Sequence, residues 1–309
     1  MSRPIVFFGN ERLATGVQTT APTLRALLAA GYDVKAVVSH FVPGQSRSAR
    51  QLEIAVVAAE HSIPVLLPDR PADILEELAA FGADVAVLVA YGKIIPQSVI
   101  DLFPRGIVNI HPSLLPLHRG PIPIESVILD GSKTTGVSVM QLVKAMDAGP
   151  VFGQAEVGLH GQETKQQLAD QLLEVGSQMV VELLPGILSG DIVAMPQDDS
   201  RTTYDELIAK PDGLLDWQKP AVVLERQIRA YSEWPKSQAV IAGKTVVVTS
   251  AHVACPDPSS APQKAGTLLS TPDKKIAVQT NDGVLVIDEL KPAGKNNMTS
   301  AAFLAGNRL

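Results

Sequence analysis

The sequence predicts a doubly wound α/β domain with a mostly parallel sheet, followed by a small β-barrel domain. Two observations support this prediction. Apolar runs of strand length alternate with helix-like segments through the first part of the chain, up to residue 189. After Trp234-Pro235, short strand-like runs are separated by turn residues, as in a small closed barrel. The length of 309 residues also favours two domains.

The first part of the chain is expected to alternate strands and helices as β-α-β units do. Gly31 follows the first helix-like run and is a suitable residue to end that helix. The run Asp84–Ala90 is apolar enough to indicate a central parallel strand buried on both faces. The expected elements are strands at 4–9, 33–39, 63–67 and 84–90, and helices at 21–30, up to about residue 61, and at 72–81.

The middle of the chain is expected to complete this sheet and to end in a linker. A long helix over 163–188 should be interrupted near Pro185, because proline lacks the N–H that a helix interior needs. Residues 190–203 show no clear periodicity and contain many turn formers, which predicts a linker. The strands expected in this part are at 107–111, beside the strand at 84–90, and at 136–142 and 151–159.

The C-terminal part is expected to form a helical stretch followed by strands. Residues 206–233 are predicted to be mostly helical, with the clearest helix over 221–230, and Gly243 and Gly283 lie where tight turns between strands are expected. The strands are expected at 237–241, 244–252, 266–269, 275–280 and 283–290. These patterns predict a first domain at 1–189, a linker at 190–205 and a C-terminal domain at 206–309.

Composition limits the classes of protein to which the chain can belong. Hydrophobic residues at 46% and charged residues at 19% are typical of a globular protein with sizeable cores. The single cysteine, Cys255, excludes an internal disulfide or a multi-thiolate metal site, and it fits a reducing compartment. The sequence predicts neither a signal peptide nor a run long enough to cross a bilayer, so we expect a cytoplasmic protein with no membrane contact.

The net charge is −6 at pH 7, which by itself argues against a nucleic-acid partner. The charge is unevenly distributed. Residues 1–205 carry an excess of eight negative charges, and residues 206–309 carry an excess of two positive charges. A C-terminal part that is more basic than the rest is compatible with a polyanion that docks across both, although two charges make no basic patch.

Three polar residues are candidates for chemistry around the strand at 107–111. Asn109 and His111 are two residues apart, so in an extended chain both point to the same face. Pro112 ends the pairing of this strand, which places them at its carboxyl end, where ligands bind in open α/β sheets. Asp147 follows the next strand. A carboxylate beside an imidazole favours the charged ring, which can stabilise an oxyanion while an amide orients the carbonyl under attack.

These residues could also serve the backbone alone. Asn109 and His111 could satisfy peptide groups at a strand end, and Asp147 could cap a turn beside Gly149. Spacing by itself does not decide between the two interpretations. The loop after the first strand lacks the G-x-G-x-x-G spacing, so the fingerprint of a dinucleotide site is absent.

The pattern Asn109-x-His111-Pro-Ser-Leu-Leu-Pro, followed by Arg119-Gly120 and Asp147-x-Gly149, resembles the signature of the 10-formyltetrahydrofolate-dependent formyltransferases. The resemblance implies that Asn109, His111 and Asp147 are the catalytic trio. It also implies 10-formyltetrahydrofolate as co-substrate, with no metal. The residues implied in the folate site are Ser113, Leu114, Leu115, Pro116, Ala90, Tyr91, Gly92 and Gln141.

The C-terminal third resembles the methionyl-tRNA formyltransferases within that family. The similar stretches include Arg226-Gln-Ile-Arg-Ala-Tyr-Ser-Glu-Trp-Pro235 and Leu290-Lys-Pro-Ala-Gly-Lys295, so the resemblance covers essentially the whole chain. It implies a formyltransferase fold followed by an OB-like β-barrel that supports tRNA docking. The implied reaction is formylation of the amino group of methionyl initiator tRNA. We expect a monomer.

Three places depart from the family pattern, and all of them concern tRNA recognition. Leu13 stands where the family usually has an aromatic residue that touches the methionyl side chain. The loop over 42–50 is shorter and less basic than the insertion that enters the acceptor stem, and only Arg47 and Arg50 remain. Two asparagines follow Lys295 in place of a more basic pair. The resemblance therefore implies Leu13 in the methionyl pocket, and Arg47, Arg50 and Lys295 as contacts of the tRNA.

Three other functions stay open at this point. A sugar-nucleotide N-formyltransferase shares the His-Pro-Ser-Leu-Leu-Pro and Met-Asp-Ala-Gly stretches and has a related barrel, although the ending from Lys295 to Met298 argues against it. A 10-formyltetrahydrofolate hydrolase would use water as acceptor on the same fold. A tRNA-binding module without activity would keep the barrel, but intact Asn109, His111 and Asp147 argue against it.

Overall fold

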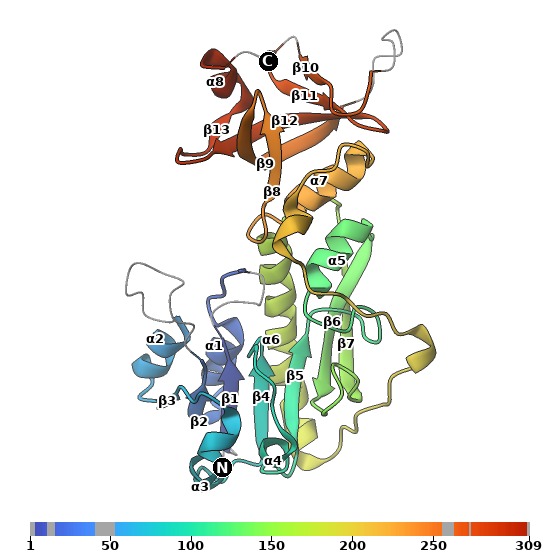
Figure 1. Cartoon of the computed structure of the whole chain (residues 1–309). Coiled ribbons are helices and arrows are strands. Elements are labelled where there is room, and N and C mark those ends of the chain that lie inside the picture. Colours follow the sequence, from blue (N-terminus) through green and yellow to red (C-terminus); the bar gives the residue numbers. More distant parts are fainter. Residues whose placement is uncertain (1–3, 11–15, 41–52, 255–262, 272, 308–309) are drawn as a thin grey trace. The chain divides into compact units, whose positions relative to one another are not determined.

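A computed structural model describes residues 4–10, 16–40, 53–254, 263–271 and 273–307 of the chain. The chain forms two compact units (Figure 1). The first unit contains residues 1–123, 134–159 and 166–206, and the second contains residues 124–133, 160–165 and 207–309.

The first unit is built on a seven-stranded sheet in the order β3-β2-β1-β4-β5-β6-β7. Strands β1 to β5 are parallel, and β6 and β7 are antiparallel to their neighbours. The mostly parallel sheet predicted from the sequence is therefore confirmed. Its strands are β1 (Pro4–Gly9), β2 (Asp33–Val38), β3 (Val65–Leu66), β4 (Val85–Val89), β5 (Ile107–His111), β6 (Thr134–Gln141) and β7 (Val151–Gly158).

Helices connect these strands in the predicted alternation. Gly31 adopts a φ of 80° just after the first helix, which is the left-handed conformation that ends helices. The sequence does not predict α4, which has four residues and is too short for a periodic pattern. The helices of this part are α1 (Pro22–Ala29), α2 (Glu53–Glu60), the 3-10 helix η1 (Pro71–Ile74), α3 (Leu75–Ala80), α4 (Gln97–Ile100), α6 (Lys165–Ser189) and the 3-10 helix η2 (Asp199–Arg201).

Helix α6 continues through Pro185, so the predicted interruption is wrong. Proline has no N–H, which leaves the carbonyl of Val181, four residues earlier, without its helical partner. The Tyr32 hydroxyl donates to that carbonyl at 3.1 Å. Because this contact replaces the lost hydrogen bond, the helix can keep its course.

The same helix is, among the described residues, the one element long and apolar enough by length and composition to cross a membrane. The sequence analysis expects no such run. Burial accounts for the difference, since Leu168, Leu172 and Val180 lie inside the protein with almost no exposure. A long apolar helix of this kind is also found in the cores of proteins that have no membrane span.

The middle of the first sheet is its most buried part. All residues of β4 and β5 are buried. Phe8 of β1 packs edge-on against the rings of Tyr91 and Phe103, with ring centroids 5.5 and 6.2 Å away. Leu88 of β4 is the neighbour of Asn109 of β5, so β5 is paired with β4 on one side and with β6 on the other.

The second unit has a six-stranded antiparallel sheet in the order β10-β11-β12-β9-β8, with β13 paired to β12. All five predicted strands are present. The expected closed ring is not, because no pairing joins β8 to β10 among the described residues, and the sheet forms a half-barrel. Its strands are β8 (Ser237–Ile241), β9 (Lys244–Ala254), β10 (Leu268–Ser270), β11 (Ile276–Gln279), β12 (Val284–Pro292) and β13 (Met298–Thr299).

Four short helical elements belong to this unit. Helix α7 coincides with the clearest predicted helix, but residues 206–220 contain only a short 3-10 helix, so the expectation of a mostly helical stretch over 206–233 is wrong. Leu224 and Ile228 of α7 join a core that includes Val248 and Ile287 of the sheet. The sequence does not predict α5, α8 or the two-residue strand β13. The elements are α5 (Pro123–Asp130), the 3-10 helix η3 (Lys210–Gly213), α7 (Ala221–Ala230) and α8 (Ser300–Ala305).

Candidate active site

Strand β5 carries two of the three candidate catalytic side chains at its carboxyl end. Asn109 and His111 are 6% and 4% exposed. Alternation along a strand puts residues two apart on the same face of the sheet. Their neighbours across the sheet on β6 are Met140 and Ser138. Both side chains therefore project from a buried strand whose backbone is held on two sides.

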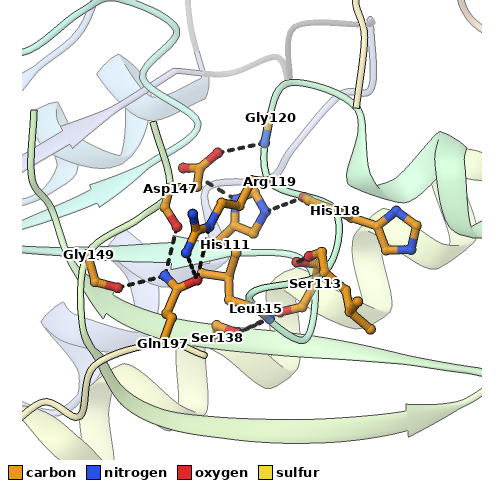
Figure 2. A network of polar contacts seen from close by, with 11 residues as sticks. His111, Ser113, Leu115, His118, Arg119, Gly120, Ser138, Asp147, Gly149 and Gln197 are labelled. Carbon is orange, nitrogen blue, oxygen red and sulfur yellow. Dashed lines mark hydrogen bonds and ion pairs between the residues drawn. The ribbon is translucent and has the colours of Figure 1, made fainter. Parts of the chain in front are cut away.

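The ring of His111 lies between a carbonyl and a carboxylate (Figure 2). Its Nε2 is 2.9 Å from the carbonyl oxygen of His118, which can only accept, so Nε2 carries a proton. Its Nδ1 is 3.7 Å from Oδ1 of Asp147, an ion-pair distance that is too long for a hydrogen bond. The Nδ1 side of the ring therefore faces the Asp147 carboxylate without a direct hydrogen bond.

The loop that carries Asp147 is held at several points. Oδ2 of Asp147 accepts a hydrogen bond from the Gly120 N–H at 2.8 Å. The residue itself has a φ of 48°, in the left-handed region that few non-glycine residues adopt and that aspartate adopts more readily than most. Gly149 passes so close to Gln141 that a Cβ would stand 1.8 Å from the Gln141 carbonyl oxygen, so only glycine fits there.

The turn Ser113–Pro116 follows β5 and is anchored to β6 and β7. The Ser138 hydroxyl donates to the Ser113 carbonyl at 2.7 Å and accepts from the Leu115 N–H at 3.0 Å. The Gln154 amide donates to the Leu115 carbonyl at 2.8 Å. The Ser113 hydroxyl donates to the Leu117 carbonyl, so it stabilises its own turn. The Ser113 hydroxyl and the Leu115 peptide groups are therefore used within the protein, and they hold the turn at this edge of the sheet.

The turn Ala90–Gly92 follows β4, the parallel neighbour of β5, so it lies at the same edge of the sheet. Ala90 and Gly92 have φ values of 49° and 76°. Burial raises the pKa of Tyr91 to about 12. The Tyr91 hydroxyl is buried and has no hydrogen-bond partner among the described residues. The side chain of Tyr91 therefore anchors the turn through its ring.

A histidine lies beside this turn. The rings of His40 and Tyr91 meet edge-on with centroids 5.7 Å apart, and Nε2 of His40 is 3.2 Å from the side-chain amide of Asn10. Burial lowers the pKa of His40, and the charge of Lys93 lowers it further. The ring is therefore suited to the neutral form.

The remaining predicted residues are spread over the chain. The side chain of Gln141 lies against Gly106, where an added Cβ would stand 2.8 Å from its amide nitrogen. Lys295 is exposed between β12 and β13 of the second unit. Leu13, Arg47 and Arg50 lie outside the residues that the structure describes.

The structure adds residues that the sequence analysis does not place in the site. Arg119 is 3% exposed and donates to Gln197, Asp199 and Tyr204. Gln197 in turn donates to the backbone carbonyls of Asp147 and Gly149 (Figure 2). Arg119 stands in the quoted family pattern. Nothing in the local sequence indicates a role for Gln197 in the site, because its segment shows neither helix nor strand periodicity.

Carboxylates and imidazoles do not gather elsewhere in a way that suits a metal. Within the described part of the chain, no group of three or more histidine, cysteine, aspartate or glutamate side chains could hold a metal ion. The groups that the candidate residues offer around β5 are the amide of Asn109, the imidazole of His111 and the carboxylate of Asp147.

Comparison with known proteins agrees with this geometry. A model of the formyl transferase family matches residues 19–184, and a model of the formyl transferase C-terminal domain matches residues 207–308. The chain belongs to the formyl transferase family. A relative from Chloroflexus aggregans named methionyl-tRNA formyltransferase is 38% identical over 98% of this chain and 96% of its own length.

Solved structures share the fold at lower identity. HypX from Aquifex aeolicus, in complex with tetrahydrofolic acid, is 19% identical with a TM-score of 0.65, over 98% of this chain and 46% of that one. This chain thus spans about half the length of HypX. An N-formyltransferase from Helicobacter canadensis, with folinic acid and dTDP-3-aminofucose, is 16% identical with a TM-score of 0.69, over 94% of this chain and 100% of that one. A formyl-tetrahydrofolate co-substrate is the family's formyl donor, and the chain is a one-carbon transferase.

Proposed function

We propose that the chain transfers the formyl group of 10-formyltetrahydrofolate to the amino group of methionyl initiator tRNA, and so supports translation initiation. The observation that carries the proposal is the His111–Asp147 pair on a formyl transferase domain that the family's own C-terminal domain follows. Relatives named methionyl-tRNA formyltransferase match both parts over nearly their full length.

The reaction needs an oxyanion site and a path for protons. The amino nitrogen of the methionyl group attacks the formyl carbon, a C–N bond forms, and the carbonyl electron pair moves to oxygen. The bond from the same carbon to N10 of the folate then breaks as the electrons return. The attacking nitrogen loses a proton and N10 gains one, so no other reactant is consumed.

We assign the oxyanion site to Asn109 and His111, which project from one face of β5. The Nδ1–H edge of His111 is the one that can meet the substrate, because Nε2 is already bonded to the His118 carbonyl. Asp147 compensates the ring charge from 3.7 Å and is the base suited to take the proton of the amine. Hydrogen-bond donors aimed at a developing charge in a buried site give large rate effects.

We place the folate at the edge formed by the Ser113–Pro116 turn, the Ala90–Gly92 turn and Gln141. The first two follow neighbouring parallel strands, at the end where ligands bind in open α/β sheets. A crystal soaked with a folate analogue tests this assignment. We expect electron density for the analogue against both turns. Density for the analogue elsewhere, with this edge empty, would contradict the assignment.

We propose that the second unit serves the tRNA, with Lys295 as one contact on its exposed edge and with Arg47, Arg50 and Leu13 on the first domain. The proposed division is a catalytic domain at 1–189, a linker at 190–205 and a tRNA-binding domain at 206–309, working as a cytoplasmic monomer. Phosphate contacts supply most of the affinity for nucleic acid, so few basic residues should give weak binding with a shallow dependence on salt concentration.

One assay distinguishes this proposal from the other functions of the fold. The purified protein receives 10-formyltetrahydrofolate with methionyl initiator tRNA, with a sugar nucleotide that bears a free amine, or with water alone. Formyl-methionyl-tRNA is the expected product. Formyl transfer to the sugar alone, or release of formate alone, would replace the proposal with the corresponding activity.

Two variants test whether the product is formed at the site that contains His111. His111→Ala should abolish most of the turnover, whereas His160→Ala changes an exposed histidine of the second unit and should leave it unchanged. Equal turnover in both variants would separate the activity from the His111–Asp147 pair.

A further inference from the structure

Gln197 lies in a segment expected to be a linker, yet its side chain holds the backbone of the loop that carries Asp147. We propose that Gln197, fixed by Arg119, is a positioning residue that sets the place of the Asp147 carboxylate relative to His111. This inference rests on the proposed function, because it assumes that Asp147 takes part in formyl transfer.

The contact between Gln197 and the loop is bidentate. The Nε2 of Gln197 donates to the carbonyl oxygens of Asp147 and Gly149, at 2.8 and 2.7 Å (Figure 2). An NH2 group has two hydrogens, so the two bonds use its whole donor capacity. One amide thereby fixes the two peptide groups that follow Asp147 and Gly149, next to the Asp147 side chain.

Arg119 determines which way the amide of Gln197 points. Its Nε and Nη2 donate to Oε1 of Gln197 at 3.1 and 2.7 Å. A guanidinium has no acceptor, so the oxygen of Gln197 must face it and the nitrogen must face the loop. Because Arg119 is 3% exposed, this orientation is held in a site that water reaches poorly.

The segment that carries Gln197 is itself anchored to the first unit. Met195 and Val151 exchange two backbone hydrogen bonds, each 2.8 Å long. After Gln197, the backbone of Arg119 bonds with Thr203 and Asp205, at 3.0 and 2.8 Å. The backbone on both sides of Gln197 is therefore fixed to the first unit. The Gln197 side chain can restrict the position of the Asp147 loop because its own backbone is held.

Asp147 is a residue that needs such support. Its φ of 48° is in a sparsely populated region, which persists only where the surroundings determine it. Its carboxylate has two tasks at once, with Oδ2 on the Gly120 N–H at 2.8 Å and Oδ1 at 3.7 Å from His111. A shift of about 1 Å in a group that orients a reaction can cost about a hundredfold in rate.

The test compares Gln197→Leu and Gln197→Glu with the wild type. Leucine removes the amide, and glutamate keeps its shape and the contact with Arg119 but turns an oxygen toward the two carbonyls. Both variants should lower kcat by about ten- to a hundredfold, while KM for the folate and for the tRNA changes by less than about threefold. Because a smaller fraction of folded protein would also lower apparent kcat at unchanged KM, turnover is expressed per active site, counted by single-turnover formylation.

A second measurement asks whether Gln197 acts through Asp147. In an Asp147→Ala background, Gln197→Leu should cost no further turnover, because there is no carboxylate left to position. A loss of the same factor in both backgrounds would overturn the proposal. So would wild-type kcat in both Gln197 variants.

Gln227→Leu is the matched control. Gln227 is also buried and also donates to two backbone carbonyls, those of Asp212 and Leu214, but it lies in the second unit. Its loss should lower the melting temperature and leave kcat unchanged. If the wild-type protein does not formylate methionyl-tRNA, the proposed function fails before the role of Gln197 is tested, so the two failures are distinguishable.

Discussion

A buried ion pair in the second unit gives a sharp test of how this unit is stabilised. The side chains of Lys165 and Glu125 are 0% and 3% exposed, and Nζ lies 3.5 Å from Oε1. Nζ also lies 3.5 Å from the carbonyl oxygen of Trp234. At an effective dielectric constant of about 20, two unit charges at this distance attract each other by about 5 kcal/mol.

Desolvation opposes this attraction. Each ion loses several kcal/mol of hydration when it is buried, so the intact pair adds little net stability. Removal of one partner is different, because the other charge stays buried without its nearest counter-charge. Lys165→Met or Glu125→Gln should therefore each lower the free energy of unfolding by about 3–5 kcal/mol. This is a large part of the roughly 5–15 kcal/mol that holds a typical domain.

The double variant Lys165→Met with Glu125→Leu provides the decisive comparison. It removes both charges and keeps apolar volume, so it should recover most of the loss and is expected to unfold at a urea concentration close to that of the wild type. Lys275→Met is the control, because its pair with Asp288 is partly exposed and should add little to stability.

Tryptophan fluorescence reports on the right part of the molecule. The chain has two tryptophans, Trp217 and Trp234, and both lie in the second unit. Urea unfolding followed by this signal therefore measures the unit that holds the pair. Losses below about 1 kcal/mol in both single variants, or a double variant worse than either single one, would refute the reasoning.

The pH dependence of stability gives an independent check that the buried charge of Lys165 causes the loss in Glu125→Gln. Burial lowers the pKa of Lys165, and Glu125 raises it, so Glu125→Gln should lower it further. The folded variant then releases a proton at a pH where the unfolded chain, with a lysine pKa of 10.5, still binds it. Stability rises with pH wherever the unfolded state binds more protons. The deficit of Glu125→Gln should therefore shrink as the pH is raised from neutrality towards 10.5.

Four further outcomes are expected. His111→Ala and Asp147→Ala should each lower turnover by at least about a hundredfold, and the double variant should be little worse, because the two groups act as a unit; additive losses in steady-state kinetics would contradict this. Tyr91→Phe should leave the urea midpoint unchanged or raise it, since no described residue bonds the buried hydroxyl; a clear drop would reveal a partner. Because the pKa of His40 is lowered in the folded protein, the unfolded chain binds the His40 proton at a higher pH than the folded protein does, so thermal stability should fall as the pH decreases through 6.5. A His40→Gln variant should lose this part of the dependence of melting temperature on pH. An unchanged dependence would rule out His40 as its source. Lys295→Ala should weaken binding of methionyl-tRNA and reduce the slope of log affinity against log salt by about one, as for one lost phosphate contact; an unchanged slope would remove Lys295 from the interface.

The sequence predicts best those elements whose buried residues form a continuous apolar run or a regularly spaced apolar stripe. Strand β4 lies within an apolar run with both faces buried, and helix α7 has an apolar stripe that joins the core of the second unit. By contrast, α5 has eight residues and begins at the second proline of a Gly-Pro-Ile-Pro stretch, a composition that resembles a turn. The open edge between β8 and β10 depends on how the whole sheet curves, which no single strand records.

Interactions between distant residues explain the remaining differences. Local sequence predicts that Pro185 breaks α6, and the contact that keeps the helix intact comes from Tyr32, 149 residues before Val181. In the same way, the bonds of Gln197 to the Asp147 loop span 50 and 48 residues. A pattern with the period of a helix or a strand carries no information about such pairs.

The three candidate catalytic groups differ in how they are held, and this difference explains why a distant glutamine matters. Asn109 and His111 stand on a strand that is hydrogen-bonded on both sides. Asp147 stands in a loop that leaves β6 after Gln141, opposite Val108 at the amino end of β5, and is closed at its base by the bond from the Gln141 N–H to the Pro150 carbonyl. The sheet therefore fixes the ends of this loop but not the residue that faces His111. The Gly120 N–H and the Gln197 amide hold Asp147 in place through hydrogen bonds to its carboxylate and to its backbone carbonyl. Gly120 belongs to the segment that follows β5, and Gln197 to the segment that follows α6.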